Sequence, residues 1–70
     1  MNANALKAKI IFNGLTVPIV CEKTGISPSC FYRKLAGKVE FTQGEISEIS
    51  RVLELNKDEI FAIFFEKEVS

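Results

Sequence analysis

The 70-residue sequence predicts an all-α protein: a five-helix bundle in which the second and third helices form a helix-turn-helix. Apolar residues recur three and four positions apart, as in helices. The strict alternation of apolar and polar residues that is typical of a β-strand never extends beyond four residues. Glycines and prolines stand where helices end and begin. The composition, 47% hydrophobic and 26% charged, is that of a globular chain, and this length suffices for one small domain over residues 1–70.

The first two helices are predicted by an apolar stripe and by residues that end or cap helices. Residues 4–12 place Leu6, Ile10 and Ile11 at helical spacing, and Gly14 allows the left-handed turn that ends a helix. Thr16 is a favourable N-cap for a second helix that runs to residue 24, because Pro18 then falls in the first turn, where its missing N–H is not needed.

The remaining helices follow the same rules. Gly25 closes the second helix, and Ser27 followed by Pro28 opens a third that runs to residue 36. A fourth helix begins at the capping box of Thr42 and Glu45, and a fifth at that of Asn56 and Glu59. The fifth helix is expected to fray beyond Phe65.

The formal net charge is zero, but the charges are separated along the chain. Residues 1–39 hold six basic residues against one acidic residue, a net charge of +5, whereas residues 40–70 hold three against eight, a net charge of −5. Such a distribution orients a molecule in the field of a polyanion, with the basic side inward. Uneven charge also arises by chance in small domains, so this pattern alone decides nothing.

Enzymatic chemistry is not expected. The chain has no His, and no nucleophile is paired with a base, so no catalytic residue, small-molecule substrate or cofactor is predicted. Cys21 and Cys30 have no further ligands to complete a metal site, and we interpret them as buried, reduced thiols. No membrane span or export signal is recognised, which predicts a cytoplasmic protein.

Residues 17–35 have the spacing of a helix-turn-helix, in which the second helix enters the DNA major groove. Val20 and Phe31 are expected to face each other across the turn, and Cys21 to lie where only a small side chain lets the helices approach. A helical hairpin without a ligand is the alternative.

The stretch 6–55 resembles the lambda-repressor/Cro-like helix-turn-helix family, in particular its small phage-type repressors. The resemblance is carried by Leu15-Thr16, by the turn from Glu22 to Ser27, by the run from Arg33 to Lys38, and by Phe41-Thr42. It implies a five-helix bundle that binds operator DNA in a sequence-specific manner, usually as a dimer. The sequence departs from the family pattern at Val17, Pro28 and Lys34.

Helix geometry assigns roles on double-stranded DNA. If Phe31 faces the core, the opposite face of the third helix carries the expected base-reading residues Pro28, Ser29, Tyr32 and Arg33. A surface ion pair with a glutamate of the fourth helix is the alternative for Arg33. The resemblance implies phosphate contacts at Thr16 and Lys38. Ser27 and Lys34 are further expected phosphate contacts, with a solvated lysine as the alternative for Lys34.

The expected partners are DNA and a second protein chain. Phe64 and Phe65 form either a lid on the bundle's own core or an exposed patch that joins a partner subunit. At least one of Phe61, Phe64 and Phe65 is expected to contact a second copy or another repressor. The main hypothesis is a DNA-binding transcriptional regulator. The alternative is an interaction module that modulates another repressor, which Val17, Pro28 and the acidic second half favour.

Overall fold

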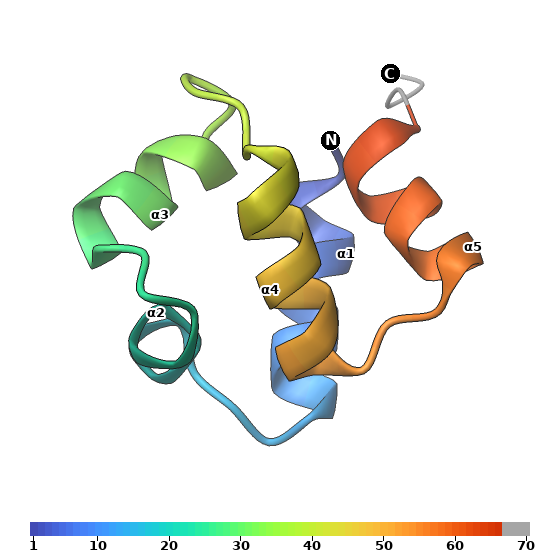
Figure 1. Cartoon of the computed structure of the whole chain (residues 1–70), viewed down its shortest axis with the longest axis horizontal. Coiled ribbons are helices and arrows are strands. Elements are labelled where there is room, and N and C mark those ends of the chain that lie inside the picture. Colours follow the sequence, from blue (N-terminus) through green and yellow to red (C-terminus); the bar gives the residue numbers. More distant parts are fainter. Residues whose placement is uncertain (67–70) are drawn as a thin grey trace.

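A computed structural model describes residues 1–66, and within that range it contains five helices and no strand. The helices are α1 (Ala3–Phe12), α2 (Val17–Thr24), α3 (Pro28–Leu35), α4 (Gln43–Leu53) and α5 (Lys57–Ile60), which continues directly into the π-helical turn η1 (Phe61–Phe65). The prediction of an all-α protein is confirmed. Figure 1 shows α2 and α3 at one end of the molecule and α5 at the other, with α1 and α4 between them.

The predicted caps are present. The Thr16 hydroxyl accepts a hydrogen bond from the Ile19 N–H, and the Ser27 hydroxyl accepts one from the Cys30 N–H. Both capping boxes, Thr42 with Glu45 and Asn56 with Glu59, have their two reciprocal hydrogen bonds. Helix α2 ends at Gly25, whose φ of 75° lies in the left-handed region that favours glycine.

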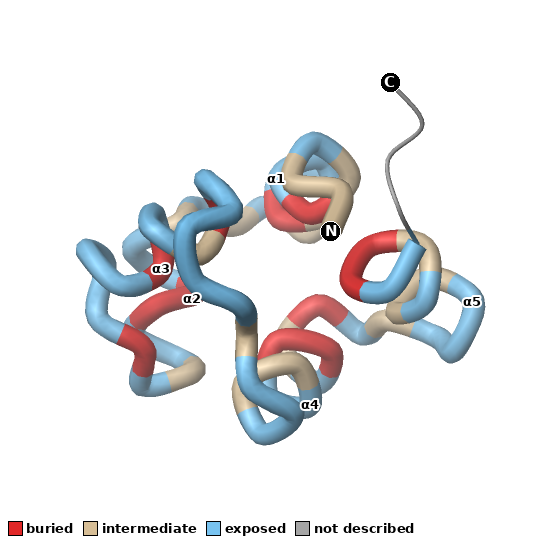
Figure 2. The backbone as a smooth tube through the Cα atoms, turned by 90° about the horizontal axis from the view of Figure 1, so that it is seen from above, coloured by how far each residue is buried: buried red, intermediate tan, exposed pale blue. Residues whose placement is uncertain are grey.

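The core draws on every α-helix except α5, on the α2–α3 turn and on η1, and Figure 2 shows its buried stretches turned toward the centre. Phe31 of α3 is completely buried, and its ring meets Phe41 edge-on at a centroid distance of 5.6 Å. Phe41 in turn meets Phe64 at the same distance. The buried apolar residues are Leu6, Ile10, Val20, Cys21, Ile26, Phe31, Leu35, Ile49, Leu53, Ile63 and Phe64.

Two helix ends differ from the sequence prediction. Helix α3 ends at Leu35, one residue early, because Ala36 serves as its C-cap. The fifth helix is α-helical only to Ile60, after which the chain widens into η1, and the Glu66 N–H donates to the Phe61 carbonyl five residues back at 2.9 Å.

The two cysteines lie in different environments, so the prediction that both are buried is wrong for Cys30. Cys21 is buried beside α3, whereas Cys30 is exposed, because the burial of its neighbour Phe31 turns the preceding position of α3 outward. Both thiols are free. Burial raises the pKa of the Cys21 thiol, with a backbone hydrogen bond acting in the opposite direction, so this thiol stays protonated at neutral pH.

We expect Cys21→Leu to destabilise the protein by about 1 to 3 kcal/mol, because the larger side chain overpacks the junction of α2 and α3. Cys21→Ala should cost only about 1 kcal/mol, since it removes one buried atom and adds none. Urea unfolding of the two variants checks this. Equal losses would show that side-chain size does not limit the approach of the helices.

Candidate nucleic-acid interface

One face of α3 is free of contacts with the core. Pro28, Ser29, Tyr32 and Arg33 are all exposed, and Tyr32 keeps 52% of its surface. Positions four apart in a helix share a face, so Pro28 lies beside Tyr32 and Ser29 beside Arg33. The four predicted base-reading residues therefore form one outward surface, which we call the α3 face.

The amphipathic sequence of α3 fixes this orientation. Ser27 caps the helix, Pro28 starts it with a suitable φ, and Phe31 and Leu35, four positions apart, both enter the core. Helices α2 and α3 are joined by only three residues, 25–27, with Ile26 buried beneath them. The short connection and the two anchors hold the α3 face in a fixed position on the bundle.

Arg33 makes no ion pair with any residue in the range 1–66. The alternative predicted for it, a pair with a glutamate of the fourth helix, is formed by its neighbour Lys34 instead. Consequently, the guanidinium of Arg33 and its five N–H groups are available to a ligand.

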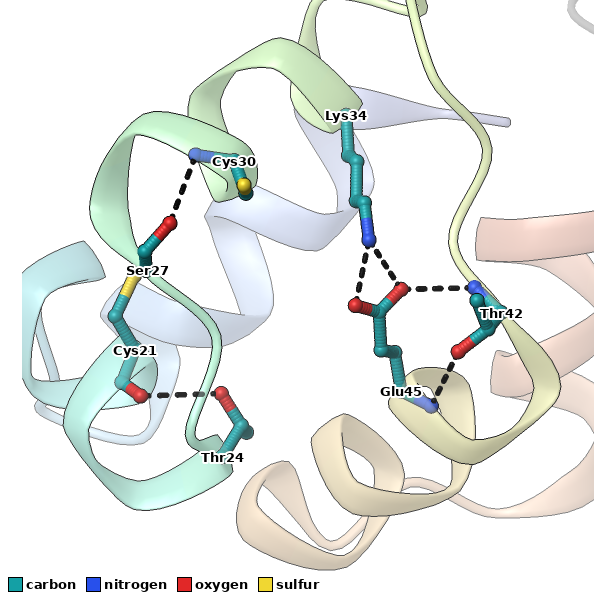
Figure 3. A network of polar contacts seen from close by, with 7 residues as sticks. All are labelled: Cys21, Thr24, Ser27, Cys30, Lys34, Thr42 and Glu45. Carbon is teal, nitrogen blue, oxygen red and sulfur yellow. Dashed lines mark hydrogen bonds and ion pairs between the residues drawn. The ribbon is translucent and has the colours of Figure 1, made fainter.

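Lys34 is engaged inside the protein, as Figure 3 shows. Its ammonium lies 2.5 Å from both carboxylate oxygens of Glu45, and its side chain is only 11% exposed. The same carboxylate accepts the Thr42 N–H at 2.9 Å and so completes the capping box of α4. This network joins the end of α3 to the start of α4, and it removes Lys34 from the predicted phosphate contacts, since its charge is neutralised by Glu45.

Partial burial by itself raises the pKa of the Glu45 carboxyl, but hydrogen bonds from Lys34 and Thr42 and the lysine charge outweigh it and leave the pKa lowered. A lowered folded-state pKa contributes stability above the ordinary glutamate pKa, and this contribution disappears as the pH falls through the lowered value.

We therefore expect Glu45→Gln to lower the free energy of unfolding by about 1 kcal/mol at neutral pH and to have little effect at pH values below the lowered pKa. Thermal unfolding across this pH range measures the difference. Glu48→Gln is the matched control on α4, because Glu48 forms only an exposed pair with Arg51. A loss for Glu45→Gln that is independent of pH would contradict the role of the charge.

The other predicted phosphate contacts, Thr16, Ser27 and Lys38, are exposed, although some of their polar groups already form hydrogen bonds within the protein. Thr16 and Ser27 are exposed, and each uses its hydroxyl oxygen to cap a helix while its hydroxyl proton is still available to donate. Lys38 is exposed in the turn after α3, where its N–H donates to the Arg33 carbonyl at 3.1 Å. This backbone bond keeps Lys38 close to the end of the α3 face.

The charges on α3 and on the turns directly before and after it are all positive. Residues 23–39 contain four basic residues and no acidic residue, and only Lys34 among them is paired within the described chain. The glutamates of α4 and α5 follow later in the chain, where Glu45, Glu48 and Glu59 each face a cation of the protein. Positive charge on α3 and the turns beside it is suited to a polyanionic ligand, and the exposed carboxylates of Glu22 and Glu40 lie just outside this stretch.

The predicted oligomer contact is only partly exposed. Phe64 is buried, so the prediction that it contacts a partner is wrong, and the lid interpretation holds for this ring. Phe61 and Phe65 keep 60% and 58% of their surface. Ile63 and Phe64 follow Ile60 by three and four positions and face inward, whereas Phe61 and Phe65 lie on the outer side of the same turn.

Within 1–66 no three His, Cys, Asp or Glu side chains are grouped as metal ligands, and no helix has the length and apolar character needed to cross a bilayer. A cavity of about 290 Å³ lies beside the loop after α3, lined by apolar residues such as Val39, Phe41 and Phe65 together with Lys34 and Glu40.

Sequence reasoning missed the pairing of Lys34 with Glu45, because no pattern in a single sequence relates the two residues. It also missed an exposed apolar surface on α1, although the signal was present: Ile11 and Phe12 both lie off the core face.

The chain matches no protein-family model, no curated protein and no solved structure. The resemblance to lambda-repressor/Cro-like proteins therefore rests on the motif residues alone.

Proposed function

We propose that the protein is a sequence-specific DNA-binding regulator of transcription that inserts α3 into the major groove of an operator. The observation that carries the proposal is the α3 face, a rigidly anchored helix surface on which Ser29, Tyr32 and Arg33 are exposed and Arg33 is unpaired within the described chain. The geometry of two helices joined by three residues, with α3 facing outward, agrees with a helix-turn-helix.

Each side chain of the α3 face suits a different part of the DNA. Arg33 would donate two hydrogen bonds to guanine O6 and N7, and Ser29 would bond a base edge or a phosphate. Pro28 has no donor and would contact a thymine methyl. Tyr32 would reach the sugar-phosphate backbone.

The backbone of the DNA would be held at both ends of the motif. Thr16 at the start of α2 and Ser27 at the start of α3 place hydroxyl groups and free N–H groups at helix N-termini, where phosphate is favoured. Lys38 would contact a phosphate beyond the other end of α3. We place this activity in the cytoplasm, where both thiols stay reduced.

The direct experiment is selection from a random-sequence duplex pool, followed by measurement of affinity by fluorescence anisotropy at several salt concentrations. We expect an enriched site that binds at least about 10³-fold more tightly than a random duplex, with an affinity that falls as salt rises. Lys57→Ala is a control, because Lys57 is exposed on α5, at the opposite end of the molecule from α3. Failure to enrich any site would refute the proposal.

The second candidate is a module that binds another repressor through the same fold. It is favoured by the pairing of Lys34 with Glu45, which occupies one cation of α3, and by Pro28, which offers a base edge no hydrogen-bond donor. A protein of this kind would show no salt-dependent binding to duplex DNA, so the same experiment separates the two candidates.

A further inference from the structure

The cavity of about 290 Å³ lies where segments far apart in the sequence meet. Its walls come from Met1, from the end of α3 with the loop that follows it, from α4 and from the end of η1. Figure 1 shows the N-terminus, this loop and the end of η1 on the same side of the molecule. The volume is close to that of the smallest pockets that bind small molecules, whereas packed interiors leave few voids larger than a water molecule. We call this space the loop cavity.

Most of the residues that line the loop cavity are apolar, and three of them are phenylalanines. Phe41 and Phe64 meet edge-on at a centroid distance of 5.6 Å, and their contacts with the core hold both rings in place. Ile46 of α4 and Val39 of the loop add aliphatic walls. Phe65 keeps 58% of its surface, so its ring lies at the outer edge of the cavity. A ligand that fills this space therefore needs an apolar body.

Two charged side chains also line the loop cavity, and one of them is already paired. The Lys34 ammonium lies 2.5 Å from both carboxylate oxygens of Glu45 and 5.9 Å from the centre of the Phe41 ring. Glu40 is exposed and forms no ion pair with any residue in the range 1–66. Among the side chains that line the cavity, the unbalanced charge is therefore the negative charge of Glu40. Because like charges repel, a ligand with a carboxylate is disfavoured and one with a positive group is favoured.

The position of Glu40 also sets the orientation of such a ligand. Glu40 and Phe65 are both exposed, so a positive group beside them stays in contact with water and avoids the cost of burying a charge. The face of the Phe65 ring would attract the same group. The apolar body would then lie against Phe41 and Phe64. This orientation keeps the positive group away from Lys34, whose side chain is only 11% exposed and whose ammonium would repel it.

We propose that the loop cavity binds a small apolar amine, with its ring or branched alkyl group against Phe41 and Phe64 and its ammonium beside Glu40 and Phe65. Such a ligand is not among the partners expected from the sequence, which are DNA and a second protein chain. The proposal does not depend on the DNA-binding activity, and its test contains no DNA. The failure of either proposal is therefore distinguishable from the failure of the other.

The test is an NMR titration of the whole isotope-labelled chain with 2-phenylethylamine, which joins a phenyl ring to a primary ammonium. The matched probe is 3-phenylpropionate, because it has the same phenylethyl group but carries a carboxylate. We expect 2-phenylethylamine to shift the amide signals of Val39, Phe41 and Phe65 in a saturable manner and to leave those of α2 unchanged. The acid should bind at least about threefold more weakly, since Glu40 repels its charge.

Two pairs of variants test the contacts with the ligand. Phe65→Ala should weaken the binding of 2-phenylethylamine by about three- to tenfold, because a ring contact is lost. Phe61→Ala is its matched control, since Phe61 is similarly exposed but does not line the cavity. Glu40→Gln should weaken binding about threefold, and Glu48→Gln, which is also outside the cavity, should not. Circular dichroism should show that all four variants keep the fold, since the four side chains are exposed.

Three outcomes would overturn the proposal. Shifts that do not saturate, or that appear away from Val39, Phe41 and Phe65, would show that the loop cavity is not the site. Equal or tighter binding of 3-phenylpropionate would show that the class of ligand is wrong. An unchanged affinity in both Phe65→Ala and Glu40→Gln would show that neither side chain contacts the ligand.

Discussion

Phe31→Ala is expected to destabilise the protein by about 3 to 5 kcal/mol, the largest effect of any substitution considered. Phe31 is completely buried, and its ring begins the edge-to-face series with Phe41 and Phe64 that joins α3 to η1. Removing it leaves a cavity and also loses the aromatic contact. A chain of this size has a total stability of about 4 to 10 kcal/mol, so the variant should lose a large fraction of it.

Urea unfolding followed by circular dichroism measures this change. Phe61→Ala is the matched control, because Phe61 is 60% exposed, and it should change the free energy of unfolding by less than about 0.5 kcal/mol. A loss below about 1 kcal/mol for Phe31→Ala would mean that α3 is not held by this ring.

Arg33→Ala is expected to remove discrimination at one base pair of the operator, at a cost of about 1 to 3 kcal/mol. Alanine cannot replace the two donated hydrogen bonds, and no neighbouring cation of α3 is available because Lys34 is held by Glu45. Affinity for the selected site should therefore fall, while affinity for random duplex changes much less.

Lys38→Ala should behave differently, and the comparison separates base reading from backbone contact. We expect it to weaken all sequences by a similar factor and to reduce the slope of log affinity against log salt by about one. The assignment of Arg33 fails if its substitution weakens selected and random duplexes equally.

The parts of the fold that were predictable from sequence are those set by neighbours in the chain. A cap joins residues three positions apart in the chain. The capping role of the Thr16 hydroxyl and the capping box of Thr42 and Glu45 could therefore be predicted from the sequence. The outward orientation of Arg33 followed from the spacing of Phe31 and Leu35 within a single helix.

The features that sequence did not predict depend on residues brought together by packing. Lys34 and Glu45 are eleven residues apart and on different helices, so their pairing follows only from how α3 and α4 meet. Cys30 is an exception, because its exposure follows from its position next to Phe31 within α3, which the interpretation of both thiols as buried disregarded. The sequence also predicted a regular helix to Phe65 and gave no sign of the widened turn η1.

That widened turn has a consequence for how the chain can change length. A π-helical turn holds one residue more than an α-helical turn, so η1 can lose a residue and still close with regular hydrogen bonds. Deleting Ala62 would move the following residues back by one position and bring Phe65 toward the place of Phe64. Phe64 would in turn move toward the place of the buried Ile63, so two apolar side chains would still enter the core, whereas the same deletion within α1 would turn Leu6 or Ile10 away from it. The end of the bundle thus carries a second aromatic that can substitute for the first when the length of the helix changes.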